Sequence, residues 1–194
     1  MAQQSGLPRT FFARPALVVA RQLLGTHLVR LEDGQRLAGI IVETEAYRGE
    51  EDLGCHCRAG RTARTQVMYG PPGHAYVYFT YGMHWMLNFV VEQEDFPAAV
   101  LIRAIAPSEG LEAMAARRRG QPAQLWTNGP AKLCQALDID RRFNGADLCA
   151  PAAQLFVEPG EEVEDARVTI GPRVGLNTVP EPWKSIPWRF LAHD

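Results

Sequence analysis

Ile40-Ile41-Val42-Glu43-Thr44-Glu45-Ala46-Tyr47-Arg48-Gly49 is the stretch around which we expect the rest of the chain to be organised. Its first residues are apolar and β-branched, which is typical of a buried strand, yet two glutamates are set into it. Because strand side chains alternate, the stretch has two expected faces: one of Ile41, Glu43, Glu45 and Tyr47, and one of Ile40, Val42, Thr44 and Ala46. One face can build a core, while the other presents carboxylates and an aromatic ring.

The two glutamates admit two interpretations. A half-buried carboxylate beside a flat ring suits a general base near a planar substrate, since desolvation raises the basicity of the carboxylate. Alternatively, both acids are solvated on an open sheet face or paired with arginine, because structural ion pairs are common. The stretch alone leaves both interpretations open.

The size and composition of the chain indicate one domain over residues 1–194. Hydrophobic residues make up 46% and charged residues 22%, which argues against disorder. A formal net charge of -2 provides no global basic field for a nucleic acid, although a local patch can bind while acids elsewhere cancel the sum. No apolar run is long enough to span a bilayer. We therefore expect a soluble cytoplasmic protein that is not secreted, with its four cysteines as free thiols.

The order of the expected elements is that of a mixed α/β (α+β) fold. Pro15 to Leu24 has helical spacing of apolar residues, and the strands His27 to Leu31 and Arg36 to Glu45 follow around a turn. The polar segment Met1 to Arg9 is expected to be frayed. Further strands are expected at 74–79, 83–91, 98–104 and 188–191, and helices at 107–118 and 131–137.

A long loop is predicted between Tyr47 and Met68, where the hydrophobic pattern stops. Its arginines, Arg58, Arg61 and Arg64, form the densest positive charge near the acidic strand, and they either bind phosphates or remain solvated. Cys55-His56-Cys57 in this loop is spaced too tightly for a usual zinc knuckle, and no second pair of ligands lies nearby. We expect no metal and no cofactor.

An aromatic hairpin is predicted after this loop. Tyr76 and Tyr78 share one face of their strand, and Tyr81-Gly82 predicts a tight turn. An aromatic ring at a hairpin tip is either a contact residue or a lid over the protein's own core. Two flat rings with a tip aromatic would suit stacking of one base and filling of the gap that it leaves.

Polar residues inside the later apolar strands need partners. Asn88 requires a hydrogen-bond partner, and Arg103 must be paired with an acid such as Glu43 or Glu45, or point into a polar cavity. Further on, Asn128-Gly129-Pro130 starts a helix that carries Lys132, and its N-terminus is a candidate phosphate site.

Four blocks of the chain resemble one family. They are Val42-Glu-Thr-Glu-Ala-Tyr, Tyr76-Val-Tyr-Phe-Thr-Tyr-Gly-Met, Val100-Leu-Ile-Arg-Ala and Asn128-Gly-Pro-Ala-Lys-Leu-Cys-Gln-Ala-Leu. In this order they resemble the alkyladenine (N-methylpurine, 3-methyladenine) DNA glycosylases, and the similarity runs over nearly the whole chain. The resemblance implies a monomeric, monofunctional repair enzyme that binds double-stranded DNA containing damaged purines. It also implies one mixed α/β domain, a curved antiparallel sheet flanked by helices with a protruding hairpin, and no metal in the chemistry.

The resemblance also implies roles for single residues in catalysis. Glu45 matches the general base that activates the hydrolytic water. Arg103 matches an arginine that helps to hold this water, and the backbone carbonyl of Val174 matches a third contact. Lys132 is then expected to meet a phosphate, because no lysine nucleophile is required.

Other matches concern the flipped base and the duplex. Tyr47 and Tyr78 match the aromatic residues that sandwich the base, His56 matches a pocket residue that contacts it, and Asn88 matches the asparagine that rejects the 2-amino group of guanine. At the duplex, Tyr81 matches a wedge inserted through the minor groove, with Met83 and Leu101 as its apolar supporters. The Cys-His-Cys setting of His56 departs from the family pattern, as does the slightly acidic net charge.

Three alternatives remain. A glycoside hydrolase could use Glu43 and Glu45, but side chains about 6.5–7 Å apart on one strand face would approach a sugar from the same side. A lesion-binding protein without turnover would keep Tyr47, Tyr78 and Tyr81 but would not need Glu45 with Arg103. A plain RNA-binding barrel would show no dependence on damaged bases.

Overall fold

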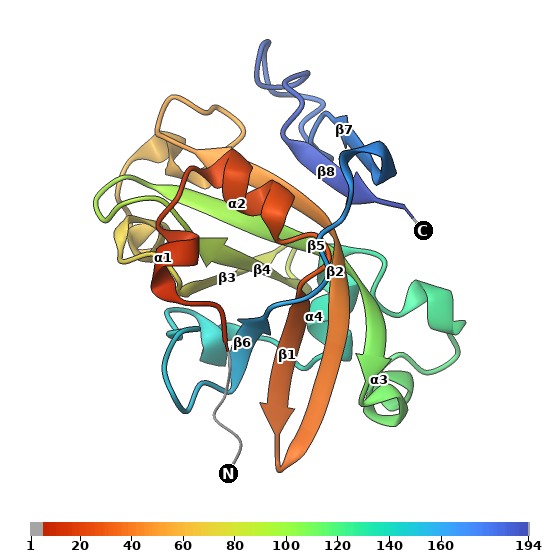
Figure 1. Ribbon diagram of the computed structural model, residues 1–194. Coiled ribbons are helices and arrows are strands. Elements are labelled where there is room, and N and C mark those ends of the chain that lie inside the picture. The colour runs from red at the N-terminus through yellow and green to blue at the C-terminus, as the bar shows by residue number, and fades with distance from the viewer. Residues whose placement is uncertain (1–5, 194) are drawn as a thin grey trace.

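A long strand, β2 (Gln35–Arg48), lies at the centre of the fold (Figure 1). In this computed structural model, which describes residues 6–193, β2 pairs with three antiparallel neighbours: β1 (His27–Glu32), β5 (Ala98–Glu109) and β8 (Arg189–Ala192). The eight-stranded sheet has the order β3-β4-β5-β2-β1-β6, with β7 added through β8. The predicted mixed α/β fold with an antiparallel sheet is confirmed.

The remaining elements surround this central strand. The hairpin strands and the two edge strands are β3 (Ala75–Thr80), β4 (His84–Val90), β6 (Leu155–Glu158) and β7 (Val168–Gly171). The helices are α1 (Arg9–Phe12), α2 (Ala16–Gln22), α3 (Leu111–Arg117) and α4 (Pro130–Ala136). Short 3-10 turns occupy residues 56–59, 66–69, 123–125, 141–143 and 165–167.

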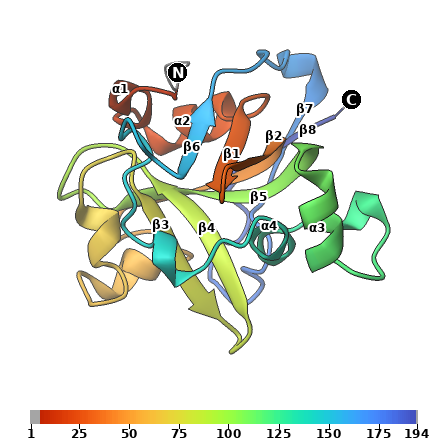
Figure 2. The ribbon, with the colours of Figure 1, turned by 90° about the horizontal axis from the view of Figure 1, so that it is seen from below.

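The main core lies on one side of the curved sheet, between the strands and two helices. Helix α2 packs on β2 and β5, whereas α4 packs on β4 and β5, as Figure 2 shows for α4. A smaller cluster of Cys55, Cys57, Met68, Tyr69, Tyr76, Val90 and Ala99 lies apart from this core. The hairpin β3–β4 projects away from the body of the molecule (Figure 2).

Two bulges change which side chains of β2 share a face. Val42 has no partner on β5, and Arg103 has none on β2, because the register shifts between Ile41 and Thr44. Ile41 therefore lies in the main core, and beyond the bulge Thr44 and Ala46 turn to the buried helix side. The predicted grouping of Ile41 with the glutamates is wrong, since an extra residue in a bulge interrupts strict alternation.

Several other expectations need correction. Strand β5 continues through Glu109, so Pro107 to Gly110 belong to the strand and its end, and α3 begins only at Leu111. The sequence pattern missed α1, β6 and β7. Of the segment expected to be frayed, residues 1–5 lie outside the described residues, whereas Arg9 begins α1 and donates a 2.7 Å hydrogen bond to Asp147.

Candidate active site

The carboxylate of Glu45 is fully buried and is held by donors from three segments. Its Oε1 accepts a 2.6 Å hydrogen bond from the backbone N–H of Val174 and lies 3.2 Å from Nη1 of Arg103. Its Oε2 accepts a 2.8 Å hydrogen bond from the hydroxyl of Tyr47. An ionised carboxylate has about four lone-pair positions, so one position stays free for a further donor such as water.

Burial and hydrogen bonding act on the pKa of Glu45 in opposite directions. Burial raises the pKa above its ordinary value, while Arg103, the Val174 N–H and the Tyr47 hydroxyl lower it. Burial, together with the charge of Glu45, also raises the pKa of Tyr47 well above its ordinary range, so this hydroxyl stays protonated and continues to donate. The result is a carboxylate of increased basicity that remains hydrogen-bonded.

Arg103 connects the two glutamates. Its Nε donates a 2.9 Å hydrogen bond to Oε1 of Glu43, and its Nη1 faces Glu45. Glu43 also lies 3.6 Å from Nη1 of Arg189 on β8. The predicted pairing of Arg103 with the glutamates is therefore confirmed, and Glu43 serves as an ion-pair partner of two arginines.

A cavity of about 260 Å³ is lined by the three residues that contact this carboxylate, Tyr47, Arg103 and Val174, although Glu45 itself does not line it. Four residues predicted to contact a base line it, namely Tyr47, His56, Tyr78 and Asn88, and so do Arg103, Leu101 and Val174. Asn88 is 4% exposed and donates a 3.1 Å hydrogen bond to the carbonyl oxygen of Tyr76, which gives it the partner that a buried amide needs. Aromatic walls that also present hydroxyl, imidazole, amide and guanidinium groups make the cavity suited to a flat heterocycle with hydrogen-bonding atoms at its edge.

His56 enters the cavity as a neutral ring. Its imidazole packs edge-on against Tyr78, with the ring centroids 4.5 Å apart. Burial, together with the charges of Arg64 and Arg58, lowers the pKa of His56 to about 4. Because Arg64 can only donate at 3.3 Å to Nε2, the proton of the ring lies on Nδ1 and is donated to the hydroxyl of Tyr76 at 3.1 Å.

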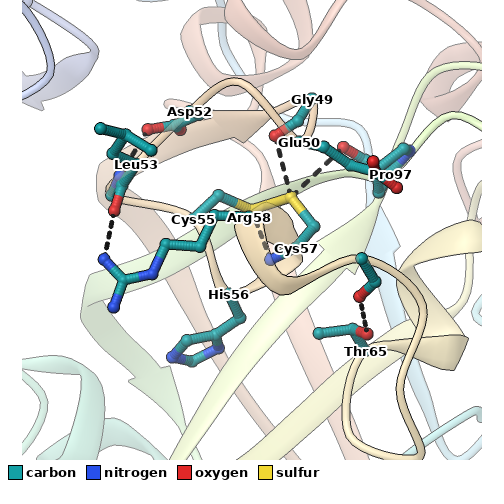
Figure 3. Close-up of a disulfide and its surroundings, with 12 residues drawn as sticks. Gly49, Glu50, Asp52, Leu53, Cys55, His56, Cys57, Arg58, Thr65 and Pro97 are labelled. Carbon is teal, nitrogen blue, oxygen red and sulfur yellow. Dashed lines mark hydrogen bonds between the residues drawn. A yellow bond between two sulfur atoms is a disulfide. The ribbon is translucent and has the colours of Figure 1, made fainter.

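The two cysteines beside His56 form a disulfide (Figure 3). Their Cα atoms lie 5.2 Å apart, within the range that a disulfide spans, so the expectation of free thiols is wrong for Cys55 and Cys57. Cys134 and Cys149 are free. Figure 3 shows the imidazole of His56 pointing away from the sulfur atoms, and Cys57 Sγ lies 3.0 Å from the carbonyl oxygen of Gly49.

The hairpin tip presents two large apolar side chains to solvent. Tyr81 is 82% exposed and Met83 is 67% exposed, whereas Leu101 is buried in the cavity wall. Tyr81 therefore covers no core of its own, although it also lines the cavity, and its role as a contact residue stays a prediction.

The four predicted phosphate contacts all have partners within the protein. Arg58 donates to the carbonyl oxygen of Leu53, Arg61 pairs with Asp95, and Arg64 contacts His56 and the Tyr78 ring. Lys132 donates a 2.8 Å hydrogen bond to Oδ1 of Asn128. The three arginines are exposed, so their outer surfaces stay accessible to an anion.

Two residues of the site were missed in the sequence: Asp52 forms a buried ion pair with Arg173, the residue before Val174. Tyr76, which the sequence pairs with Tyr78 for stacking a base, lines the cavity and is hydrogen-bonded to His56. The only available signal was an arginine inside the turn Gly171-Pro172-Arg173-Val174-Gly175, and nothing local distinguishes Asp52 from the other acids of its loop.

Two features of residues 6–193 bear on binding. No helix among them is long and apolar enough to cross a membrane. Within the same residues no three side chains of His, Cys, Asp or Glu gather as metal ligands would.

Comparisons with known proteins place the chain in a family. Residues 10–194 match the family described as methylpurine-DNA glycosylase. A protein of Myxococcus xanthus is 48% identical over 97% of this chain and 90% of its own length, and one of Methanocella arvoryzae is 50% identical over 95% and 90%. Both carry the name "Putative 3-methyladenine DNA glycosylase". The chain therefore belongs to the methylpurine-DNA glycosylase family, whose members are hydrolases of N-glycosyl bonds in damaged DNA.

Proposed function

We propose that this protein removes 3-methyladenine and related damaged purines from duplex DNA by hydrolysis, with Glu45 as the general base, and leaves an abasic site. The observation that carries the proposal is the buried carboxylate of Glu45, hydrogen-bonded on both oxygens, whose partners Tyr47, Arg103 and Val174 line an aromatic cavity. Family membership and the printed names of the relatives support the substrate.

The chemistry follows from the charge of the substrate. A 3-methylated adenine in DNA carries a positive charge, so the base leaves neutral when the glycosidic bond breaks and the base keeps both bonding electrons. Water then bonds to the sugar carbon and gives its proton to Glu45. The negative charge of Glu45 also stabilises the oxocarbenium-like transition state. Arg103 and the carbonyl of Val174 would hold the water beside it.

Binding of the base would use the aromatic cavity. Tyr47 and Tyr78 provide electron-rich rings that attract a cationic purine by stacking and cation–π interaction. His56, kept neutral by its low pKa, adds no competing positive charge to the pocket. Asn88, fixed by Tyr76, would exclude a base that carries an additional amino group.

Extrusion of the nucleotide from the stack would use the hairpin tip. Tyr81 is placed to fill the gap between the base pairs, with Met83 and Leu101 beside it. Arg58, Arg61, Arg64 and Lys132 would meet phosphates.

The location and the oligomeric state follow from the same proposal. Since the substrate is DNA, we infer a nucleoid-associated cytoplasmic location. We infer a monomer because one chain carries the whole site.

A labelled duplex with a single methylated purine or hypoxanthine tests the proposal. The expected result for the wild type is release of the free base and strand breaks only after a separate alkali step. Glu45→Gln should bind the same duplex but release base at least 10²-fold more slowly, a loss of about 2.7 kcal/mol in transition-state stabilisation. Glu43→Gln, which changes the neighbouring ion pair, is the matched control and should lose less.

Two outcomes would contradict this function. Undiminished excision by Glu45→Gln would remove Glu45 from the chemistry. Tight binding to the damaged duplex without base release by the wild type, across a panel of lesions, would favour the lesion-binding protein instead.

A further inference from the structure

An ion pair beneath the Tyr47 ring lies completely out of contact with solvent. The side chains of Asp52 and Arg173 are both 0% exposed. Arg173 donates from Nη1 to Oδ2 of Asp52 at 2.5 Å and from Nη2 to Oδ1 at 2.8 Å. Two parallel hydrogen bonds of this kind fix the orientation of a guanidinium plane as well as its position.

Arg173 also contacts the catalytic strand at the residues beside Glu45. Its Nη1 donates a 3.1 Å hydrogen bond to the carbonyl oxygen of Ala46. Its guanidinium carbon lies 4.6 Å from the centre of the Tyr47 ring and 5.1 Å from that of Trp188. The next residue, Val174, donates its backbone N–H to Glu45. The dipeptide Arg173-Val174 therefore contacts both Glu45 and Tyr47, whose hydroxyl donates to Glu45.

Asp52 brings a third segment to the same point. It lies in the loop between β2 and His56, and its Oδ1 also accepts a 2.9 Å hydrogen bond from the N–H of Gly54. A Cβ atom at Gly54 would lie 2.8 Å from Nη2 of Arg173 and 2.7 Å from Cδ1 of Leu176, so a larger residue at position 54 would have to displace one of these side chains. The pair thus joins β2, the loop that carries His56, and the turn that carries Val174.

Stability alone does not account for such a pair. Removing two charges from water costs free energy that the attraction between them often does not offset. A protein with apolar residues of the same volume in their place can be at least as stable. We propose that Asp52 and Arg173 are positioning residues, which hold the Val174 N–H and the Tyr47 hydroxyl on Glu45 so that its remaining lone pair faces the water. This inference rests on the proposed function.

Loss of this arrangement should change the titration of Glu45. The groups that face its carboxylate are Arg103 from β5, Tyr47 and Glu43 from β2, Val174 from the turn and, at longer range, Tyr78 from β3. Arg189 from β8 acts on Glu43. Of these groups, the Val174 N–H is positioned most directly by Arg173, the preceding residue. Because the hydrogen bond from this N–H lowers the pKa of Glu45, loss of the hydrogen bond should raise that pKa further.

The test compares the wild type with Arg173→Lys and Asp52→Asn. Arg173→Lys keeps the positive charge but loses the two-pronged contact and the planar stacking on Tyr47. We expect the single-turnover rate of base release to fall about 10- to 100-fold, as for misplacement of a reacting group. The acid limb of its pH profile should move to higher pH, and the titration of Glu45, followed by NMR with a 13C-labelled carboxyl carbon, should move in the same direction.

Arg48→Lys is the matched control. Arg48 also lies on β2, makes a two-pronged contact with an acid, Glu92, at 2.9 and 3.2 Å, and stacks on an aromatic ring, Phe96, at 4.9 Å. This variant should lose stability and keep the pH profile of the wild type. If Arg173→Lys does not fold, Asp52→Asn, which keeps the shape and one acceptor, decides in its place.

The possible failures are distinguishable. Absence of base release by the wild type would refute the proposed function. Release by the wild type, with the pH limb and the Glu45 titration of the variants unshifted, would overturn only the positioning role and leave the ion pair a structural feature.

Discussion

Among single residues, Glu45 should make a measurable contribution to the pH dependence of the free energy of unfolding. Its raised pKa means that the native state binds a proton more tightly than the unfolded chain, whose value is near the ordinary 4.5. The stability that the protonated Glu45 contributes is therefore fully present below pH 4.5 and is lost as the pH rises through the native pKa. A glutamine side chain does not titrate, so it makes no such pH-dependent contribution.

We therefore predict that Glu45→Gln gains stability relative to the wild type as the pH rises above 4.5. The difference in free energy of unfolding should grow and then level off above the native pKa. Urea unfolding of both proteins at a series of pH values measures it. A difference independent of pH would mean that the carboxyl group titrates normally.

His56 provides a second prediction at this scale. Its pKa of about 4, against an ordinary 6.5, keeps the ring neutral through the physiological range. Arg64→Ala removes one of the charges that lower the pKa, so the titration midpoint should rise, although burial should keep it below 6.5. NMR of the ring carbon measures this midpoint, and Arg142→Ala, whose guanidinium pairs with Asp138 and Asp140, should leave it unchanged.

At the level of elements, the β3–β4 hairpin allows the proposed DNA contact of Tyr81 to be tested separately from its effect on fold stability. Tyr81 is exposed and has a φ of 52°, the left-handed region that suits glycine. Tyr81→Gly should raise the free energy of unfolding by about 1 kcal/mol and still lower base release from duplex DNA. Tyr81→Ala should lower release without that gain in stability.

Single-stranded substrate is the control for this hairpin prediction. A wedge is needed only where a stack must be opened, so both variants should lose much less activity on a single strand. Equal losses on both substrates would indicate that Tyr81 contacts the base or its sugar instead.

The elements also show where sequence patterns succeed and where they fail. The hairpin was predictable because an aromatic strand, Tyr81-Gly82 and a second apolar strand are all local signals. The side of β2 on which Ile41 lies could not be predicted, because the bulges at Val42 and Arg103 depend on the pairing of β2 with β5, which is distant in the sequence. Pro107 misled the prediction of α3, since the end of β5 is an edge where proline is tolerated.

At the scale of the whole molecule, stability depends on the core between the sheet and its helices. Ile102 on β5 is fully buried in this core, so Ile102→Ala should lower the free energy of unfolding by about 2–5 kcal/mol. Ile170, on β7, is 54% exposed, and Ile170→Ala should change the free energy of unfolding by less than about 0.5 kcal/mol. Urea unfolding of both variants compares them, and equal effects would contradict the assignment of the core.

Short runs of side chains and motifs were enough to predict the mixed fold, most of the strands and most of the residues that meet at the site, because these signals are local. The contacts that hold those residues in place depend instead on how distant segments pack together. The Val174 N–H reaches Glu45 across 129 positions, and Arg173 reaches Asp52 across 121. Contacts of that separation arise when the strands and the C-terminal turn pack together, and no local pattern encodes their partners.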